Sequence, residues 1–215
     1  PAGPGVVAGG VVRRRNWHRP RLALSATDLA LLIVMTALVK AHLEAALAGS
    51  LVSLLFGVQH IAIFVVTLLH RPAAGQGSSR TDLLLAWAGT LLPLAMRATT
   101  APVTGVGLVL VVLGSLLATA AILSLGRSFG IEPAHRGLQT RRLYRVVRHP
   151  IYAAYLPIVG GFLLSYASWW NGLVAVIWLA VQITRIQREE ALLGQDAQYQ
   201  RYAQQVRWRV LPRVW

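Results

Sequence analysis

The chain has 215 residues, of which 55% are hydrophobic and only 13% are charged. Soluble domains carry about a quarter charged residues, so this composition excludes an ordinary soluble enzyme and indicates an integral membrane protein. The absence of cysteine excludes disulfide bonds and thiolate chemistry. Basic residues number 21 and acidic residues 7. The arginines lie mostly between apolar segments, so they indicate membrane topology and contacts with lipid phosphates, and no nucleic-acid partner.

Residues 1–24 are expected to form a flexible basic arm, rich first in Gly, Pro and Ala and then in arginine. Together with the apolar run that follows, the arm imitates a signal peptide. The run is longer than the apolar part of most signal peptides, and a second apolar segment follows directly. We therefore expect an uncleaved first membrane helix.

Six apolar segments follow the arm, each near the ~20 residues that a membrane-spanning helix needs. They predict an all-α, polytopic transmembrane bundle of six spans, in which the last two spans form a C-terminal helical hairpin. Residues 25–100 hold the N-terminal membrane helices, and residues 101–215 hold the region with the candidate site. The predicted spans are residues 25–46, 50–70, 82–98, 103–125, 151–167 and 170–188.

The distribution of arginine predicts the orientation of these spans. Nineteen of the twenty arginines fall in the N-terminal arm, in the connections 71–81 and 126–150, or from Arg185 onward. In a six-span chain all of these lie on one side, and Arg97 alone lies on the other. Because cytoplasmic loops are enriched in Lys and Arg, we expect both termini on the cytoplasmic side of a bacterial-type plasma membrane.

Polar and small residues inside the spans leave alternatives open. Gln59 and His60 fall in the middle of the second span, where they either make an interhelical hydrogen bond or line a substrate cavity. Gly105 and Gly107 begin the fourth span, and glycines there are typical of close helix packing.

Two polar clusters flank the predicted C-terminal hairpin. The first contains Arg148-His149-Pro150, in which proline suits a first helical turn, and the free amides of such a turn can bind an anion. In the second, Arg185 and Glu189 are four residues apart, on one helix face. Because a hairpin returns the chain to its starting side, the clusters predict either a polar site beside lipid or two solvated helix ends.

The two clusters together resemble the isoprenylcysteine carboxyl methyltransferase family, whose wider group includes the phospholipid N-methyltransferases. The similarity rests on Arg148-His149-Pro150-Ile151-Tyr152, the hairpin, and Arg185-x-x-x-Glu189-Glu190-x-x-Leu193. It extends over roughly residues 103–215, including Tyr199, Tyr202 and Leu211-Pro212. One departure is Arg141-Arg142-Leu143-Tyr144, where family members often have Ser-Gly-Pro-Tyr.

This resemblance implies S-adenosylmethionine as the methyl donor, bound at the cytoplasmic face, and no metal site. It implies that Arg185 is the catalytic residue that faces the acceptor. In the phospholipid branch a Gly-x-Gly and a Glu-Glu pair are cofactor signatures, which Gly105 with Gly107 and the Glu189-Glu190 pair would fill. The implied cofactor-binding residues are Leu138, Gln139, Tyr144, His149, Pro150, Tyr152, Glu189 and Glu190.

The residues suit methyl transfer to a lipophilic acceptor that enters from the bilayer. A glutamate such as Glu189 can hold a cationic group of the donor, and an arginine such as Arg185 can orient a carboxylate with two hydrogen bonds. A carboxylate acceptor needs no general base, whereas an amine or hydroxyl would need one, and only His149 is close to the motif. Two alternatives remain: a membrane reductase of the sterol reductase type that uses NADPH, and a non-catalytic membrane protein on the same scaffold.

Overall fold

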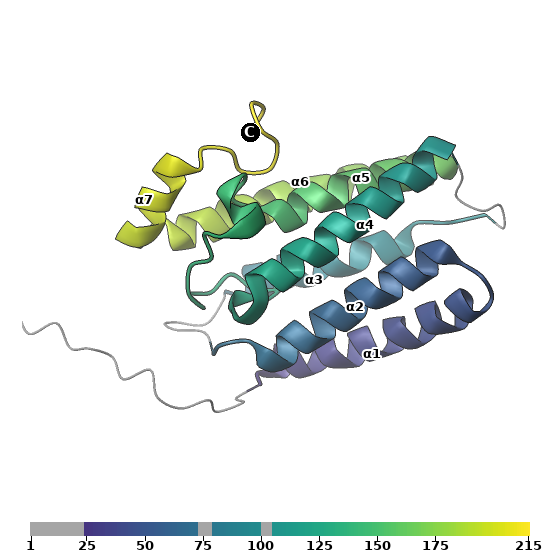
Figure 1. Ribbon diagram of the computed structural model, residues 1–215, viewed down its shortest axis with the longest axis horizontal. Coiled ribbons are helices and arrows are strands. Elements are labelled where there is room, and N and C mark those ends of the chain that lie inside the picture. Colours follow the sequence, from purple (N-terminus) through teal and green to yellow (C-terminus); the bar gives the residue numbers. More distant parts are fainter. Residues whose placement is uncertain (1–23, 73–78, 100–104) are drawn as a thin grey trace, which may run out of the picture.

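The computed structural model describes residues 24–72, 79–99 and 105–215. Over these residues the chain is all-α, as predicted, with no β-strand (Figure 1). The helices are α1 (Ala26–Leu47), α2 (Leu51–Leu69), α3 (Arg80–Leu91), α4 (Gly105–Leu125), α5 (Pro150–Ser165), α6 (Trp169–Leu193) and α7 (Ala197–Gln205), with short 3-10 turns η1 (Leu92–Ala95), η2 (Gly126–Ser128) and η3 (Arg142–Arg145).

The six helices α1 to α6 run alternately up and down, so that two ends of the bundle can be distinguished (Figure 1). The end that carries the start of α1 and the end of α6 is called the arginine end below. At this end the amide of Arg71, after α2, donates to the carbonyl of Arg127, after α4, over 2.8 Å. At the opposite end, the buried side chain of Asn171 hydrogen-bonds the backbone of Arg97.

Two helix caps at the arginine end also tie helices together. Ser25 and Asp28 form a capping box at the start of α1, and Ser79 and Asp82 form another at the start of α3. The Asp28 carboxylate lies 3.5 Å from His70 Nε2 at the end of α2, and Asp82 pairs with Arg188 on α6. Each capping carboxylate therefore stabilises the start of its own helix and also contacts a neighbouring helix.

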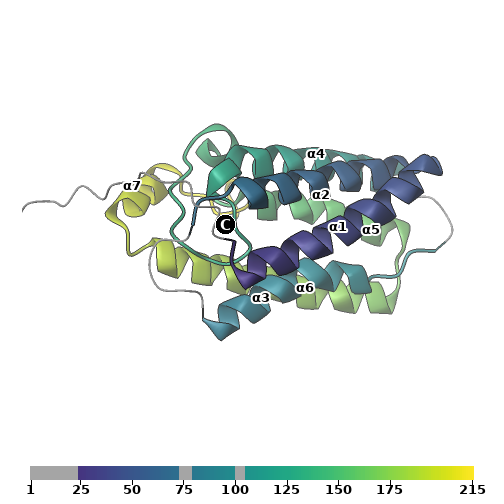
Figure 2. The ribbon, with the colours of Figure 1, turned by 90° about the horizontal axis from the view of Figure 1, so that it is seen from below.

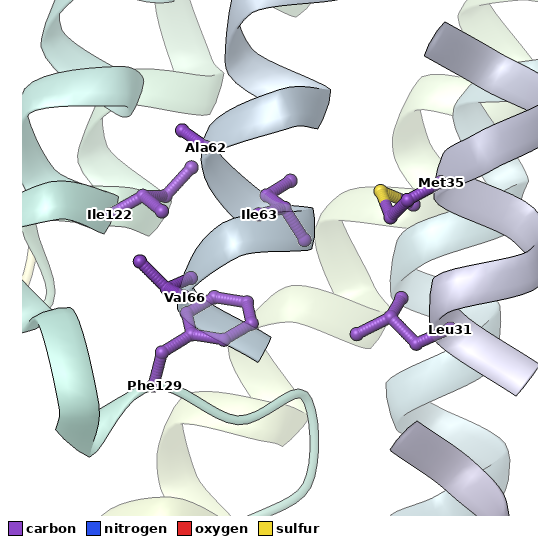
Figure 3. Packing of buried hydrophobic residues seen from close by; sticks show 7 residues of the cluster. All are labelled: Leu31, Met35, Ala62, Ile63, Val66, Ile122 and Phe129. Atoms are coloured by element: carbon purple, nitrogen blue, oxygen red, sulfur yellow. The ribbon is translucent and has the colours of Figure 1, made fainter. Parts of the chain in front are cut away.

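The helices pack as two groups. α2 packs against α1 and α4, and α4 packs against α5, whereas α3 packs mainly against α6 (Figures 1 and 2). The apolar core at the arginine end joins α1, α2 and α4 to the connection after α4 (Figure 3). It consists of Leu31, Met35, Ala62, Ile63, Val66, Ile122 and Phe129.

Glycines bring α4 and α5 into close contact. A Cβ added to Gly107 would lie 2.9 Å from the carbonyl oxygen of Gly161, and one added to Gly114 would lie 2.9 Å from that of Ala154. This agrees with the packing interpretation of Gly107. Gly107 also lies near the start of α4, about 30 Å from its end, and the cavity described below adjoins that end at Leu125.

A helix occurs at each of the six predicted places, but not all six have the length of a span. Among the described residues, four helices are long and apolar enough to cross a membrane: α1, α2, α4 with its following turn, and α6. α5 has 16 residues, and α3 has 12 before η1 continues it. Large side chains such as Leu47, Val106 and Leu164 are more than half exposed, as lipid-facing residues are. The number of spans stays a prediction.

Three local features differ from the sequence-based expectations. The last membrane span was expected to end at residue 188, and α6 continues beyond it to Leu193, so Glu190 is helical as well as Glu189. α7 was not predicted; it is a short amphipathic helix whose buried face is formed by Tyr199 and Tyr202. His60 stacks on His42 of α1 at 5.1 Å, and its hydrogen bond among the described residues is to the Phe56 carbonyl of its own helix.

Candidate functional site

The connection between α4 and α5 folds over the arginine end and forms one wall of a cavity. Glycines at positive φ, Gly126 at 52° and Gly137 at 96°, turn the backbone where residues with a Cβ are disfavoured. Gln139 fixes the connection to the end of α4, because its side-chain amide donates to the Ser124 carbonyl over 2.7 Å. Its oxygen accepts from the Arg141 amide at 3.1 Å.

The cavity has a volume of about 630 Å³ and lies between this connection, the end of α6 and α7. Its wall mixes charged, amide and aromatic side chains. Of the predicted cofactor residues, the structure brings five to this wall: Leu138, Gln139, Tyr144, His149 and Glu189. Pro150, Tyr152 and Glu190 do not line it, and Arg185 lines a neighbouring crevice.

Glu189 is the carboxylate that faces the cavity. Its side chain is 31% exposed, and it accepts a hydrogen bond of 3.3 Å from the hydroxyl of Tyr152. His149 Nδ1 lies 3.9 Å from the same carboxylate. Glu189 also lines the crevice beside Arg185, so it lies at the boundary between the two spaces together with Gly130 and Glu132.

Glu190, in contrast, is occupied by protein groups. Its carboxylate accepts from Arg148 Nε at 2.7 Å and from Arg209 Nε at 2.6 Å, and it lies 3.1 Å from His149 Nε2. The Tyr199 hydroxyl adds a fourth contact at 3.3 Å. With its side chain only 12% exposed, Glu190 is placed to hold the C-terminal tail, and its binding of a cofactor stays a prediction.

The tail folds back over the Arg148-His149 segment. The backbone amides of Arg148 and His149 donate to the carbonyls of Trp208 and Arg209, at 2.9 and 2.8 Å. On α7, the Tyr202 hydroxyl donates to the Tyr144 carbonyl over 2.7 Å. Burial raises the pKa of the Tyr144 and Tyr202 phenols, so both remain protonated at neutral pH.

Arg185 lies in a crevice between α3, α5, α6 and residues 130–133. The crevice has a volume of about 20 Å³, which is room for about one water molecule. The guanidinium donates to Gln182 Oε1 and to the carbonyl of Ile131, both at 3.0 Å, and lies 5.5 Å from the centre of the Tyr152 ring. Pro150, the first residue of α5, is buried and sets the direction of the helix that carries Tyr152.

Gly89 on α3 leaves the space that the Arg185 side chain occupies. A Cβ at Gly89 would collide with the Arg185 guanidinium and would lie 2.7 Å from Gln182 Oε1. The absence of a side chain at this position therefore allows a polar group to sit between α3 and α6.

Several wall residues were missed by the sequence analysis. Tyr199 and Tyr202 had been noticed only as part of a family-like tail. Glu132 and Arg136 come from the connection, where Arg136 had been counted as one of the topology-setting arginines. No local sequence pattern distinguishes Arg136 from its exposed neighbours Arg141 and Arg142, because its position depends on how the connection folds.

Comparison with known proteins agrees with this arrangement. Residues 103–199 match the phospholipid methyltransferase family. An alignment 112 positions long covers 48% of the chain and shows 32% identity to protein-S-isoprenylcysteine O-methyltransferase A of Arabidopsis thaliana. The segment shared with the plant methyltransferase spans 57% of that protein's length. The methyltransferase segment contains α4 to α6, Arg185, Glu189 and most of the cavity wall.

Proposed function

We propose that the protein is an integral-membrane, S-adenosylmethionine-dependent methyltransferase that acts on a lipophilic acceptor with an anionic head group at the cytoplasmic membrane face. The observation that carries the proposal is the position of Glu189. Its carboxylate lies between a cavity large enough for a cofactor and a crevice that contains Arg185. The match of residues 103–199 to the phospholipid methyltransferase family and the name of the plant relative support it.

The cavity fits the donor in size and in chemistry. Its volume of about 630 Å³ lies within the ~300–1,000 Å³ of small-molecule sites. Glu189 offers a carboxylate that no arginine neutralises within 4 Å among the described residues, and this suits a cationic group of the donor. Tyr144 and His149 provide aromatic surface on the same wall.

The surroundings of Arg185 suit an anionic acceptor. The residue lies one helical turn before Glu189, on the same face of α6, so a group held by Arg185 lies close to whatever occupies the cavity. Arginine can hold a carboxylate or phosphate with two hydrogen bonds. Since the crevice has room for about one water molecule, we expect the side chains that line it to move apart when the acceptor binds.

The residues present favour a carboxylate acceptor over an amine. When bound, S-adenosylmethionine supplies a methyl group on a cationic sulfur. Transfer of this methyl group to the acceptor leaves the sulfur as the neutral thioether of S-adenosylhomocysteine. A carboxylate is already deprotonated at neutral pH, so the site has only to align it, and alignment is a large part of such catalysis. His149, the base candidate, is held by Glu190 at 3.1 Å.

Ligand titration of the purified protein in detergent tests the cofactor. We expect binding of S-adenosylmethionine and S-adenosylhomocysteine, and none of NADPH. Glu189→Gln should weaken the binding of S-adenosylhomocysteine by about 1–3 kcal/mol, the scale for loss of a charged partner, without lowering the melting temperature of the protein. NADPH binding alone would indicate the reductase, binding of neither ligand would indicate a non-catalytic protein, and unchanged affinity in folded Glu189→Gln protein would remove this residue from the site.

A further inference from the structure

The cavity contains a guanidinium with unused hydrogen-bonding capacity. Arg136 lines the wall, and its Nε is buried without a hydrogen-bond partner among the described residues. Its Nη1 donates only to a backbone carbonyl, that of Glu132, at 3.1 Å. No carboxylate in the described part of the chain lies within 4 Å of it. A buried polar group of this kind is costly unless it is satisfied, so the unpaired Nε makes Arg136 a candidate for binding a ligand group.

The backbone holds this guanidinium against the cavity wall. A Cβ added to Gly130 would lie 2.6 Å from Arg136 Cζ, so the planar group rests where a side chain would otherwise be. Burial lowers the pKa of Arg136, whereas the charges of Asp28, Glu132 and Glu189 raise it. A guanidinium keeps its charge under such conditions. Arg136 is therefore a positioned cation that shares the cavity wall with Glu189 and Glu132.

We infer that Arg136 binds the carboxylate of the donor's amino-acid moiety, while Glu189 takes the cationic groups beside it. The inference rests on the proposed function and adds a subsite to it. Nε and a terminal nitrogen are a pair of donors that a guanidinium can present to a carboxylate. Because Nε is buried beside Gly130, we expect the guanidinium to turn toward the cavity when the donor binds. The donor carries its carboxylate and ammonium on one carbon, so it needs opposite charges close together, and this wall offers both.

The competing interpretation is that Arg136 only supports the connection through its bond to the Glu132 carbonyl. The two interpretations differ for a ligand that lacks the carboxylate. Decarboxylated S-adenosylmethionine keeps the adenosine, the sulfonium and the ammonium, and loses only the group that Arg136 would bind. A support for the wall would affect both ligands equally.

Isothermal titration of the purified protein in detergent with both ligands tests the inference. In Arg136→Gln, the affinity for S-adenosylmethionine should fall about tenfold or more, while the affinity for the decarboxylated ligand should stay unchanged. Arg136→Lys keeps the charge but not the paired donors. Its loss of affinity should therefore be smaller than that of Arg136→Gln and should again be confined to S-adenosylmethionine. Glu189→Gln should lower the affinity for both ligands, because both carry the cationic groups.

Arg141→Gln is the matched control, since it removes the same charge from an exposed position of the same connection; both affinities should stay at the wild-type values. An equal loss of both ligands in Arg136→Gln and Arg136→Lys, or unchanged affinity for S-adenosylmethionine in both, would overturn the inference. If the wild-type protein bound neither ligand, the proposed function itself would fail, and that outcome is seen before any variant is compared.

Discussion

At the scale of single residues, adjacent glutamates have different surroundings. Glu190 meets Arg148, His149 and Arg209, whereas Glu189 meets, within the described part of the chain, the Tyr152 hydroxyl and, at 3.9 Å, His149. Neighbours on a helix point about 100° apart, so one turns toward the tail and the other toward the cavity. In a family-like Glu-Glu pair, we therefore expect the first residue to bind ligand and the second to hold the fold.

The role of Arg185 can be tested by a substitution that keeps its charge. In Arg185→Lys we expect wild-type affinity for S-adenosylhomocysteine, but a loss of roughly tenfold or more in methyl transfer to a lipid extract. Lysine cannot hold an anion with two parallel hydrogen bonds, and a hydrogen bond to a charged group is worth about 1.5–3 kcal/mol. The measurement is transfer of a labelled methyl group from S-adenosylmethionine.

The control for this variant is Arg201→Lys, an exposed position on α7 that lines neither the cavity nor the crevice. It should keep full turnover. If Arg185→Lys also kept full turnover, Arg185 would only anchor the end of α6, since lysine anchors a helix end as well as arginine does.

The sequence predicted which residues share a helix face in the candidate site, but it did not predict how the backbone of the connection folds. The spacing of Arg185 and Glu189 placed them on one helix face, and this needs only helical geometry. The backbone of Arg142 was not predictable from its identity. This residue stands where family members often have glycine, and it keeps a glycine-like φ of 56°. The fold of the connection imposes this conformation on a residue that disfavours it by about 1–2 kcal/mol.

At the scale of the elements, a proline and a glycine shape the contact between α3 and α6. Pro93 has no amide hydrogen to donate to the carbonyl of Gly89, four residues earlier. Trp178 on α6 supplies the missing donor through Nε1, at 3.1 Å. The predicted span 82–98 therefore ends as an α-helix at Leu91, and the same glycine leaves room for Arg185. Apolar length alone could not show this break.

Two adjacent glycines on α5 give a matched test of the α4–α5 contact. A Cβ at Gly161 would lie 2.5 Å from the carbonyl oxygen of Gly107, whereas one at Gly160 would meet nothing within 4 Å. Gly161→Ala should therefore destabilise the protein by about 1–3 kcal/mol. Gly160→Ala should be neutral or stabilise it by up to about 1 kcal/mol through helix propensity.

Thermal unfolding in the same detergent measures both variants, and their equal hydrophobicity removes membrane insertion as an explanation. Equal melting temperatures for Gly160→Ala and Gly161→Ala would show that α4 and α5 are not in close contact at this point.

At the scale of the whole molecule, the places of the apolar helices α1 to α6 could be predicted from the sequence, whereas the fold of the C-terminal tail could not. Long apolar runs have few alternatives to helix in a membrane, because every backbone polar group needs a partner within the segment. The tail is fixed by contacts between residues far apart in sequence, such as Tyr202 with the Tyr144 carbonyl, 58 residues away. No local period or motif encodes such a contact.

The orientation of the whole bundle is the remaining prediction. The arginine end contains the candidate site, the ties to Asp28 and Asp82, and the start of α1 and end of α6. Because nineteen of the twenty arginines fall in the sequence at or next to the helix termini of this end, we expect it to face the cytoplasm. A donor made in the cytoplasm then reaches the cavity from water, while the acceptor reaches Arg185 from the bilayer.

The chain has no cysteine, so single cysteines report each side without background. Ala48→Cys and Ala167→Cys lie in the turns of the opposite end, and Thr140→Cys lies exposed in the connection over the cavity. An impermeant maleimide added to intact cells should label the first two and should label Thr140→Cys only after permeabilisation. The reverse pattern would put the cavity outside, away from the cytoplasmic donor. Labelling of Ala48→Cys but not of Ala167→Cys would mean that the last hairpin, built on the 16-residue α5, enters the membrane without crossing it.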